Sequence, residues 1–178
     1  MANILEKLAY FSGLNYNFYN TKFVFDALKK NIPSKYFNCN VVDIGCGDGT
    51  NTLLISKALK SKNIIGYEIN KYLVRNARQK GILVYTPQDK FILKGELGVL
   101  WGVVHHFNDP SQEIENIIKN FRLFIIREPT DYFRIFEAGK RYKESEMTKF
   151  IEIATKNCNK SFTKLLVPSG KSVLYFIE

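Results

Sequence analysis

Three glycines spaced two residues apart, Gly45, Gly47 and Gly49, constrain this chain more than any other feature of its sequence. They follow the apolar run 41–44 and precede a stretch that can form a helix. Glycine adopts positive φ and carries no Cβ, so such a loop turns sharply and lets a ligand lie against the main chain. The segment therefore predicts a strand–loop–helix turn that forms one wall of a nucleotide-type pocket.

The spacing of these glycines argues against a dinucleotide. The dinucleotide fingerprint G-x-G-x-x-G would need its third glycine at Thr50, and it holds a pyrophosphate at the helix N-terminus. Here Asp43 ends the strand and Asp48 lies within the loop, and two carboxylates repel a pyrophosphate. The loop suits a ligand that carries a positive charge or an amine.

The residues D-I-G-C-G-D-G-T (43–50) resemble the first motif of the class I S-adenosylmethionine (SAM) methyltransferases. About twenty residues later, a short apolar segment ends in Glu68, where that family places a carboxylate that accepts hydrogen bonds from both ribose hydroxyls. The resemblance implies SAM as the cofactor, with the three glycines for close approach, Asp43 near the methionyl amine and Glu68 on the ribose. It also implies direct methyl transfer, with S-adenosylhomocysteine as the product.

Composition indicates one folded domain. The 178 residues are 46% hydrophobic and 14% aromatic, which argues against disorder and is enough for one core. No signal-peptide pattern opens the sequence and no apolar run reaches the roughly 20 residues of a membrane span, so we expect a cytoplasmic protein without a membrane partner. The three cysteines lie far apart and form no C-x-x-C pair, so neither a disulfide framework nor a metal site is indicated.

Strands and helices alternate along the sequence, which predicts an α/β fold with a parallel sheet covered on both faces. Apolar runs predict strands at 40–44, 63–67, 82–85, 97–103 and 121–127. Helices are expected at 3–11, 19–30, 50–61, 70–80, 110–119 and 144–157. The segments 162–167 and 172–177, joined by the turn-forming linker 168–171, predict a terminal antiparallel hairpin.

The resemblance implies the same architecture, a Rossmann-like mixed sheet of seven strands with helices on both faces and a C-terminal antiparallel hairpin. We expect a single methyltransferase domain over residues 1–178, with an N-terminal helical lid segment at 1–37 and the SAM-binding core at 38–178.

The stretch 96–110 looks like the fourth motif of the same family, in which a small-residue turn faces the sulfonium and paired histidines precede the next helix. An unperturbed imidazole titrates near pH ~6.5, so it can take a proton from an acceptor at neutral pH. We assign His106 as the candidate general base; the alternative is that His105 and His106 both anchor the loop. Trp101 is placed among the cofactor-binding residues, with filling of the core as the alternative.

Two further segments follow predicted strands, at the edge where ligands sit in an open α/β sheet. The segment R-E-P-T (127–130) would face the pocket on the acceptor side, or form an ion pair that caps a loop. Gln88 and Asp89 follow the third strand, where related enzymes bind the adenine amino group, and we assign Asp89 to adenine. The eleven residues between Tyr85 and Leu97 leave room for a short helix at most.

The methyl acceptor is less constrained. Aromatic residues between Tyr10 and Tyr19 suit a pocket for a small molecule, or the packing of an amphipathic helix. The net charge of +9 favours a polyanion, and residues 134–171 carry nine Lys/Arg against four Asp/Glu, interleaved with aromatic rings that can stack on bases. We predict transfer to an O or N atom of a small metabolite. RNA or DNA is the alternative acceptor, and a non-catalytic partner subunit is a third hypothesis.

Overall fold

The structure is a computed structural model that describes residues 18–130, 140, 142–167 and 172–178. The predicted helix 3–11, residues 1–17 of the lid segment and part of the basic stretch 134–171 lie outside the described residues. None of the helices in the described ranges combines the length and the apolar character needed to cross a membrane.

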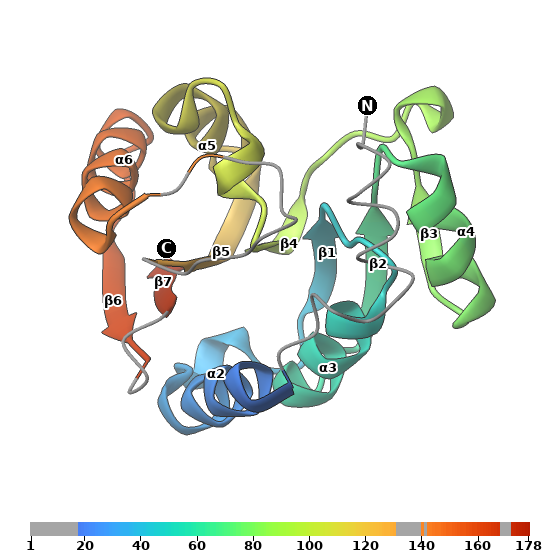
Figure 1. The fold of residues 1–178 in the computed structure, drawn as a ribbon. Helices are drawn as coiled ribbons and strands as arrows, with labels where there is room; N and C mark the ends of the chain where they lie inside the picture. The colour runs from blue at the N-terminus through green and yellow to red at the C-terminus, as the bar shows by residue number, and fades with distance from the viewer. Residues whose placement is uncertain (1–17, 131–139, 141, 168–171) are drawn as a thin grey trace.

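A seven-stranded mixed sheet forms the centre of the molecule, in the order β3-β2-β1-β4-β5-β7-β6 (Figure 1). Its strands are β1 (Asn40–Ile44), β2 (Asn63–Tyr67), β3 (Leu83–Tyr85), β4 (Gly95–Trp101), β5 (Phe121–Pro129), β6 (Phe162–Leu166) and β7 (Ser172–Ile177). The first five strands are parallel, and β7 runs antiparallel to both β5 and β6. The predicted mixed sheet with its C-terminal hairpin is thereby confirmed.

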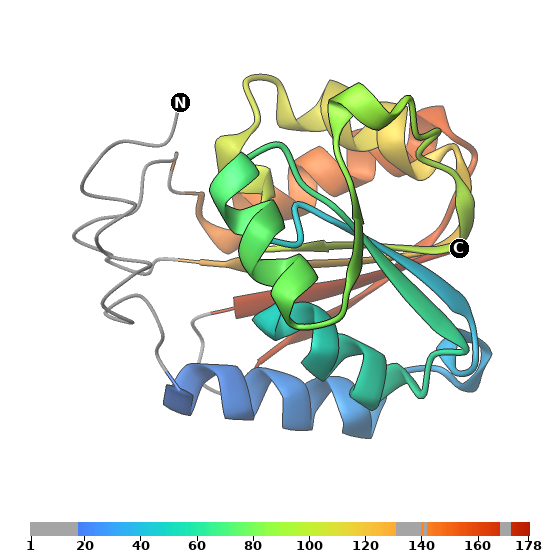
Figure 2. The same cartoon turned by 90° about the vertical axis from the view of Figure 1, so that its right-hand side faces the viewer.

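Helices cover both faces of this sheet. They are α2 (Phe18–Asn31), α3 (Thr50–Leu59), α4 (Lys71–Gln79), α5 (Pro110–Ile118) and α6 (Glu144–Asn157), with short 3-10 helices η1 (Ser34–Tyr36), η2 (Pro87–Asp89) and η3 (Val104–His106). Figure 2 shows α2 and α3 on one face and α5 and α6 on the other. Each predicted element within the described residues is present, with ends displaced by two residues at most.

Local capping explains where two of the helices begin. The side chain of Asn70 precedes α4 and accepts a hydrogen bond from the backbone N–H of Tyr72. Asp109 does the same for the N–H of Gln112 at the start of α5, and Pro110 occupies the first helical position. Both arrangements satisfy N–H groups that have no partner within the helix, and proline loses nothing there because that N–H is unpaired anyway.

Two large hydrophobic clusters pack α2, α3, α5 and α6 against the sheet, and a smaller cluster in the described residues lies beneath α4. Where α2 and α3 meet the sheet, the buried side chains include Val24, Leu28, Ile55, Leu59, Leu97, Val99 and Ile125. Beneath α5 and α6 they include Ile114, Ile118, Met147, Ile151, Phe124, Ile126 and Tyr175. The central strands are therefore buried from both sides, which is why they read as continuous apolar runs in the sequence.

The end of β4 differs from the prediction. We expected this strand at 97–103, but it begins at Gly95 and ends at Trp101. Gly102 then takes a φ of +70°, which breaks the extended backbone, and its N–H donates to the carbonyl of Arg127 at 2.7 Å. The chain turns at once into η3, so the two histidines lie on a short helical turn.

Helix α2 belongs to the core. Phe25 is buried and its ring stacks on that of Trp101, with centroids 4.8 Å apart. The lid role of segment 1–37 stays a prediction, and residues 1–17 of that segment lie outside the described residues.

We expect Phe25→Ala to destabilise the protein by about 3–5 kcal/mol, because it leaves a cavity between α2 and Trp101. The matched control is Phe23→Ala on the same helix, whose ring is 54% exposed and should cost less than about 1 kcal/mol. Urea denaturation followed by circular dichroism measures both. Equal losses would contradict the placement of α2 in the core.

Candidate functional site

The candidate site lies where the carboxyl ends of the central parallel strands meet. Strand β1 leads into the glycine loop 45–49, and β2 leads into Glu68. The register places Ile44 beside Tyr67 and Leu100, so the loops that follow these strands emerge side by side. This is the edge of a parallel sheet at which ligands bind in open α/β folds.

All three glycines of the loop have positive φ, at +73°, +57° and +81° for Gly45, Gly47 and Gly49. A Cβ at Gly45 would lie 2.6 Å from a methyl of Val103, and one at Gly49 would overlap Ile82. A Cβ at Gly47 would meet nothing within 4 Å among the described residues. Gly45 and Gly49 thus let the protein pack on itself, whereas the described residues leave room beside Gly47 for a ligand.

Glu68 joins the glycine loop to the loop after β2. Its Oε2 accepts from the N–H of Gly47 at 2.9 Å, and its Oε1 accepts from the N–H groups of Ile69 and Asn70, each at 2.8 Å. A carboxylate has about four acceptor positions, so these three bonds leave one position, on the Gly47 side. Glu68 can therefore accept one further hydroxyl, and a second would have to replace a backbone N–H.

Asp43 lies behind the glycine loop, with only 1% of its surface exposed. The hydroxyl of Thr52 donates to Oδ2 at 2.6 Å, while Oδ1 has no hydrogen-bond partner within the described part of the chain. Burial raises the pKa of this carboxyl to about 7, and the nearby Glu68 charge adds to that rise. The unpartnered oxygen suits a positively charged or amine-bearing group, which would also favour ionisation.

The second carboxylate of the loop has a different role. Asp48 accepts from the N–H and the hydroxyl of Thr50 and forms an ion pair with Lys80, 2.6 Å from Nζ to Oδ2. Partial burial raises the pKa of Asp48, but the hydrogen bonds from Lys80 and Thr50 outweigh it and hold the pKa below its ordinary value. This tie from the end of α4 fixes the loop conformation.

The predicted adenine ligand, Asp89, caps η2. Its carboxylate accepts from the N–H and the hydroxyl of Thr86, both at 2.7 Å, and lies 4.0 Å from Arg78. The interaction of Asp89 with adenine stays a prediction.

The two histidines separate into a buried and an exposed one. His105 is buried, and its Nδ1 forms a hydrogen bond with Oε1 of the buried Glu128. The other oxygen of Glu128 accepts from the N–H of Val104 at 3.1 Å, so this carboxylate holds η3 in place. His106 is exposed, and its ring lies against that of His105 at a centroid distance of 4.1 Å. His106 is therefore accessible to an acceptor, and its catalytic role stays a prediction.

Trp101 and Arg127 lie on the α2 side of the sheet. The indole of Trp101 stacks on Phe25. The guanidinium carbon of Arg127 lies over the same indole, 5.9 Å from the ring centroid. Arg127 also donates to the hydroxyl of Ser172 at 2.7 Å. This packing fits the core-filling alternative for Trp101, and a contact with a cofactor stays a prediction.

Three residues that shape the site were not singled out from the sequence: Thr52, Lys80 and Val103. Thr52 lies two residues into α3, and its position opposite Asp43 depends on the angle between strand and helix. Lys80 reaches the loop from a different helix, so no local pattern signals it. Val103 fills the space that a Cβ at Gly45 would need.

Comparison with known proteins supports the architecture. No protein-family model matches the chain. Over 145 residues it is 31% identical to ribosomal RNA small subunit methyltransferase A of Mycoplasma mobile, an alignment that spans 81% of this chain and 50% of that protein. The chain thus spans about half the length of this curated relative.

Solved structures give the same result at the level of fold. The plantazolicin methyltransferase BpumL, solved in complex with SAH, superposes with a TM-score of 0.72 at 13% identity, over 99% of this chain and 91% of that one. The methyltransferase domain of bacterial CtHen1-CN gives a TM-score of 0.68 at 16% identity, over 92% of this chain and 99% of that one. The chain has the class I SAM-dependent methyltransferase fold. The resemblance indicated by the glycine motif is confirmed at this level.

The buried Asp43 makes stability depend on pH. Its pKa is about 7 in the folded protein, above the ordinary value of 3.8. Between pH 3.8 and about 7, the folded protein therefore keeps a proton on Asp43 that the unfolded chain has lost. The contribution of Asp43 is therefore most favourable below pH ~4 and is lost as the pH rises through ~7. We expect Asp43→Asn to gain stability relative to the natural protein over this window, by up to about 1.4 kcal/mol per pH unit.

Urea denaturation of both proteins at several pH values between 4 and 8 measures this difference. A difference that stays constant with pH would show that the Asp43 carboxyl titrates alike in the folded and unfolded chains.

Proposed function

We propose that this chain is a SAM-dependent methyltransferase that moves a methyl group to an O or N atom of its acceptor. The observation that carries the proposal is the open side of Gly47 beside the Glu68 carboxylate, which is hydrogen-bonded to the Gly47 N–H at 2.9 Å. A bare backbone next to a carboxylate with one remaining acceptor position suits a ribose hydroxyl of a nucleoside.

The described residues fit the other parts of the same cofactor. The unpartnered Oδ1 of Asp43 offers a negative charge behind the loop, where the methionyl amine would lie. Bound SAM would supply a methyl group that is already electrophilic on its sulfonium sulfur. The protein then has to hold the acceptor in line with that methyl group, and such positioning contributes up to ~7–11 kcal/mol in favourable cases.

His106 is the candidate base for the acceptor proton. It is exposed on η3 next to His105, whose own ring is held by Glu128. An imidazole at this place takes a proton from a hydroxyl or amine of the acceptor, which makes the attacking atom more nucleophilic. Glu128 acts through His105 and the N–H of Val104 as a positioning residue for η3.

The acceptor of our first proposal is a small molecule. RNA is the second candidate, because the relative that is 31% identical over 145 residues is a ribosomal RNA methyltransferase. The basic charge of +9 supports the second candidate as well. A cytoplasmic location and dependence on a partner subunit remain predictions from the sequence.

Gly47→Val tests the cofactor site. We expect it to reduce SAM affinity at least a hundredfold, because the side chain would fill the open space beside Glu68. The control is Gly81→Val. Gly81 also has positive φ, at +81°, and a Cβ there would meet no described residue within 4 Å, but it lies beyond the end of α4. Both variants carry the strain of a left-handed residue, about 1–2 kcal/mol or more.

Calorimetric titration with SAM, S-adenosylhomocysteine and NAD measures the affinity of each variant for these ligands. The natural protein and the Gly81 variant should bind the first two ligands and not NAD. Unchanged SAM affinity in Gly47→Val would place the cofactor elsewhere, and Gly47→Ala gives a milder version if the valine variant fails to fold.

His106→Ala should lower the rate of methyl transfer about 10²–10⁴-fold at neutral pH, because the acceptor then loses its proton to water. SAM affinity should stay within twofold, since the histidine acts on the acceptor side. The measurement is transfer of tritium from methyl-labelled SAM to fractions of a cell extract. An unchanged rate would leave His106 as a surface residue of η3.

A further inference from the structure

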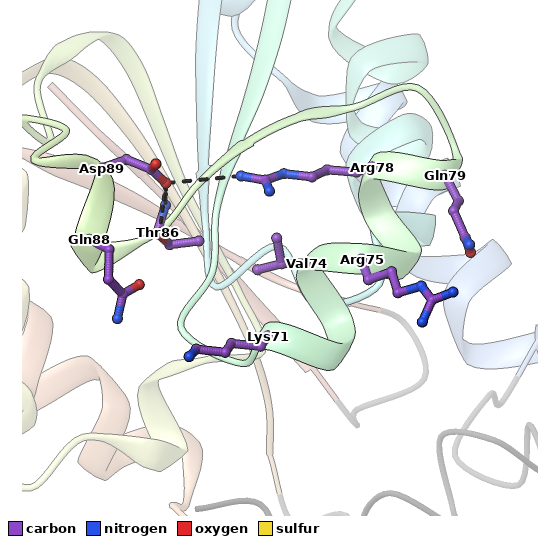
Figure 3. A pocket seen from close by; sticks show the side chains of 8 residues that line it. All are labelled: Lys71, Val74, Arg75, Arg78, Gln79, Thr86, Gln88 and Asp89. Carbon is purple, nitrogen blue, oxygen red and sulfur yellow. Dashed lines mark hydrogen bonds and ion pairs between the residues drawn. The ribbon is translucent and has the colours of Figure 1, made fainter.

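A basic groove lies outside the glycine loop, between α4 and η2 (Figure 3). Its volume is about 590 Å³, and its lining comes from Lys71, Val74, Arg75, Arg78, Gln79, Thr86, Gln88 and Asp89. Figure 3 shows Lys71 and Arg78 extending from the helix toward the segment that carries Gln88 and Asp89. Asp89 is also the predicted adenine ligand, whereas the three cations of the lining have no assigned role beside Gly47, Glu68 or His106.

The groove has three cations, all from α4; Figure 3 shows Lys71 and Arg78 extending toward the η2 segment and Arg75 extending away from it. Lys71, Arg75 and Arg78 are separated by four and three residues, the spacing that places side chains on one face of a helix. At 1.5 Å per residue they extend along roughly 10 Å of the helix. A single phosphate group is too small to contact all three, whereas successive phosphates of a strand can do so.

The groove keeps an excess of positive charge. Asp89 is the one carboxylate among its lining residues, which leaves three positive charges against one negative charge. Its pair with Arg78 is long, at 4.0 Å, and both side chains are well exposed, at 53% and 40%. Such a pair contributes little free energy in water, so an incoming phosphate can compete with Asp89 for the guanidinium.

We propose that this groove binds the phosphate backbone of a single-stranded nucleic acid. Arginine matches phosphate with two parallel N–H donors, and Gln79, Gln88 and Thr86 can bond to sugar and phosphate oxygens. The concave shape fits a strand better than a flat anionic membrane. Tyr72, in the same first turn of α4 as Lys71, is 41% exposed and offers a ring on which a base can stack.

The groove begins next to the proposed cofactor site. Lys71 lies three residues after Glu68, and Gln88 and Asp89 follow the carboxyl end of β3, which pairs with β2. A strand held in the groove would therefore pass beside Glu68. The groove favours the second candidate of the proposed function, a nucleic acid acceptor, over the small molecule, and that part of the inference rests on the proposed methyl transfer.

The test is binding of fluorescein-labelled 12-nucleotide RNA and DNA of the same sequence, measured by fluorescence anisotropy at 50–200 mM salt. The groove variant is Lys71→Gln with Arg75→Gln and Arg78→Gln. The charge-matched control is Lys29→Gln with Lys30→Gln and Lys57→Gln, three exposed lysines on α2 and α3. SAM affinity of both variants is measured by calorimetry, which also reports whether each variant folds.

We expect the groove variant to lose at least tenfold in affinity at 100 mM salt for one or both oligonucleotides. The slope of log K against log salt should become shallower by about 2, because three phosphate contacts that contribute ~0.7 each to the slope are removed. The control should change less than threefold. SAM affinity should be unchanged in both variants. The oligonucleotide that responds identifies RNA or DNA as the source of the backbone.

Equal losses in the two variants would overturn the groove as a specific site, since net charge alone would then explain binding. Binding of a mononucleotide, or of poly-glutamate of equal charge, as tight as that of the oligonucleotides would also overturn it. Failure of the natural protein to bind SAM, with the groove effect intact, would instead contradict the proposed methyl transfer and leave the binding groove standing.

Discussion

Close packing around the glycine loop is the constraint on which the rest of the site depends. Val103 and Ile82 occupy the places that side chains at Gly45 and Gly49 would need, so the loop lies tightly between η3 and the start of β3. The N–H of Gly47 then points at Glu68, and the strand ends of β1, β2 and β4 are held in one arrangement. Side chains are excluded at Gly45 and Gly49, whereas the described residues leave room beside Gly47.

Three buried carboxylates, Asp43, Glu68 and Glu128, lie around this loop and η3. Burying a charge is unfavourable unless donors surround it, and the donors here are backbone N–H groups, the Thr52 hydroxyl and the His105 ring. The interior near the loop is therefore negative, although the whole chain carries +9. Among the described residues Arg127 is the buried cation, and the exposed cations include those of the groove along α4. One molecule thus offers a site for a cation close to a surface for anions.

The sequence was sufficient for most of the fold because the central strands are continuous apolar runs and two of the helices, α4 and α5, have polar N-caps. It also indicated the glycine loop and Glu68, since both follow strands directly. It did not indicate Lys80 or Thr52, whose contacts join elements through space. It did not separate the buried His105 from the exposed His106, because adjacent residues on a 3-10 turn differ only through the position of Glu128. The role of Trp101 was also ambiguous, because its burial depends on packing against Phe25 of α2, which is distant in the sequence.

Arg78 also contacts the backbone of the edge strand β3. Its Nη2 donates to the carbonyl of Val84 at 2.7 Å, and β3, the strand that contains Val84, is the outermost strand on its side of the sheet. An outermost strand presents backbone groups to which another chain can add. Here the strand has only three residues and one of its carbonyls is already occupied by a bulky cation. The sheet therefore ends in a blunted edge that disfavours self-association during folding.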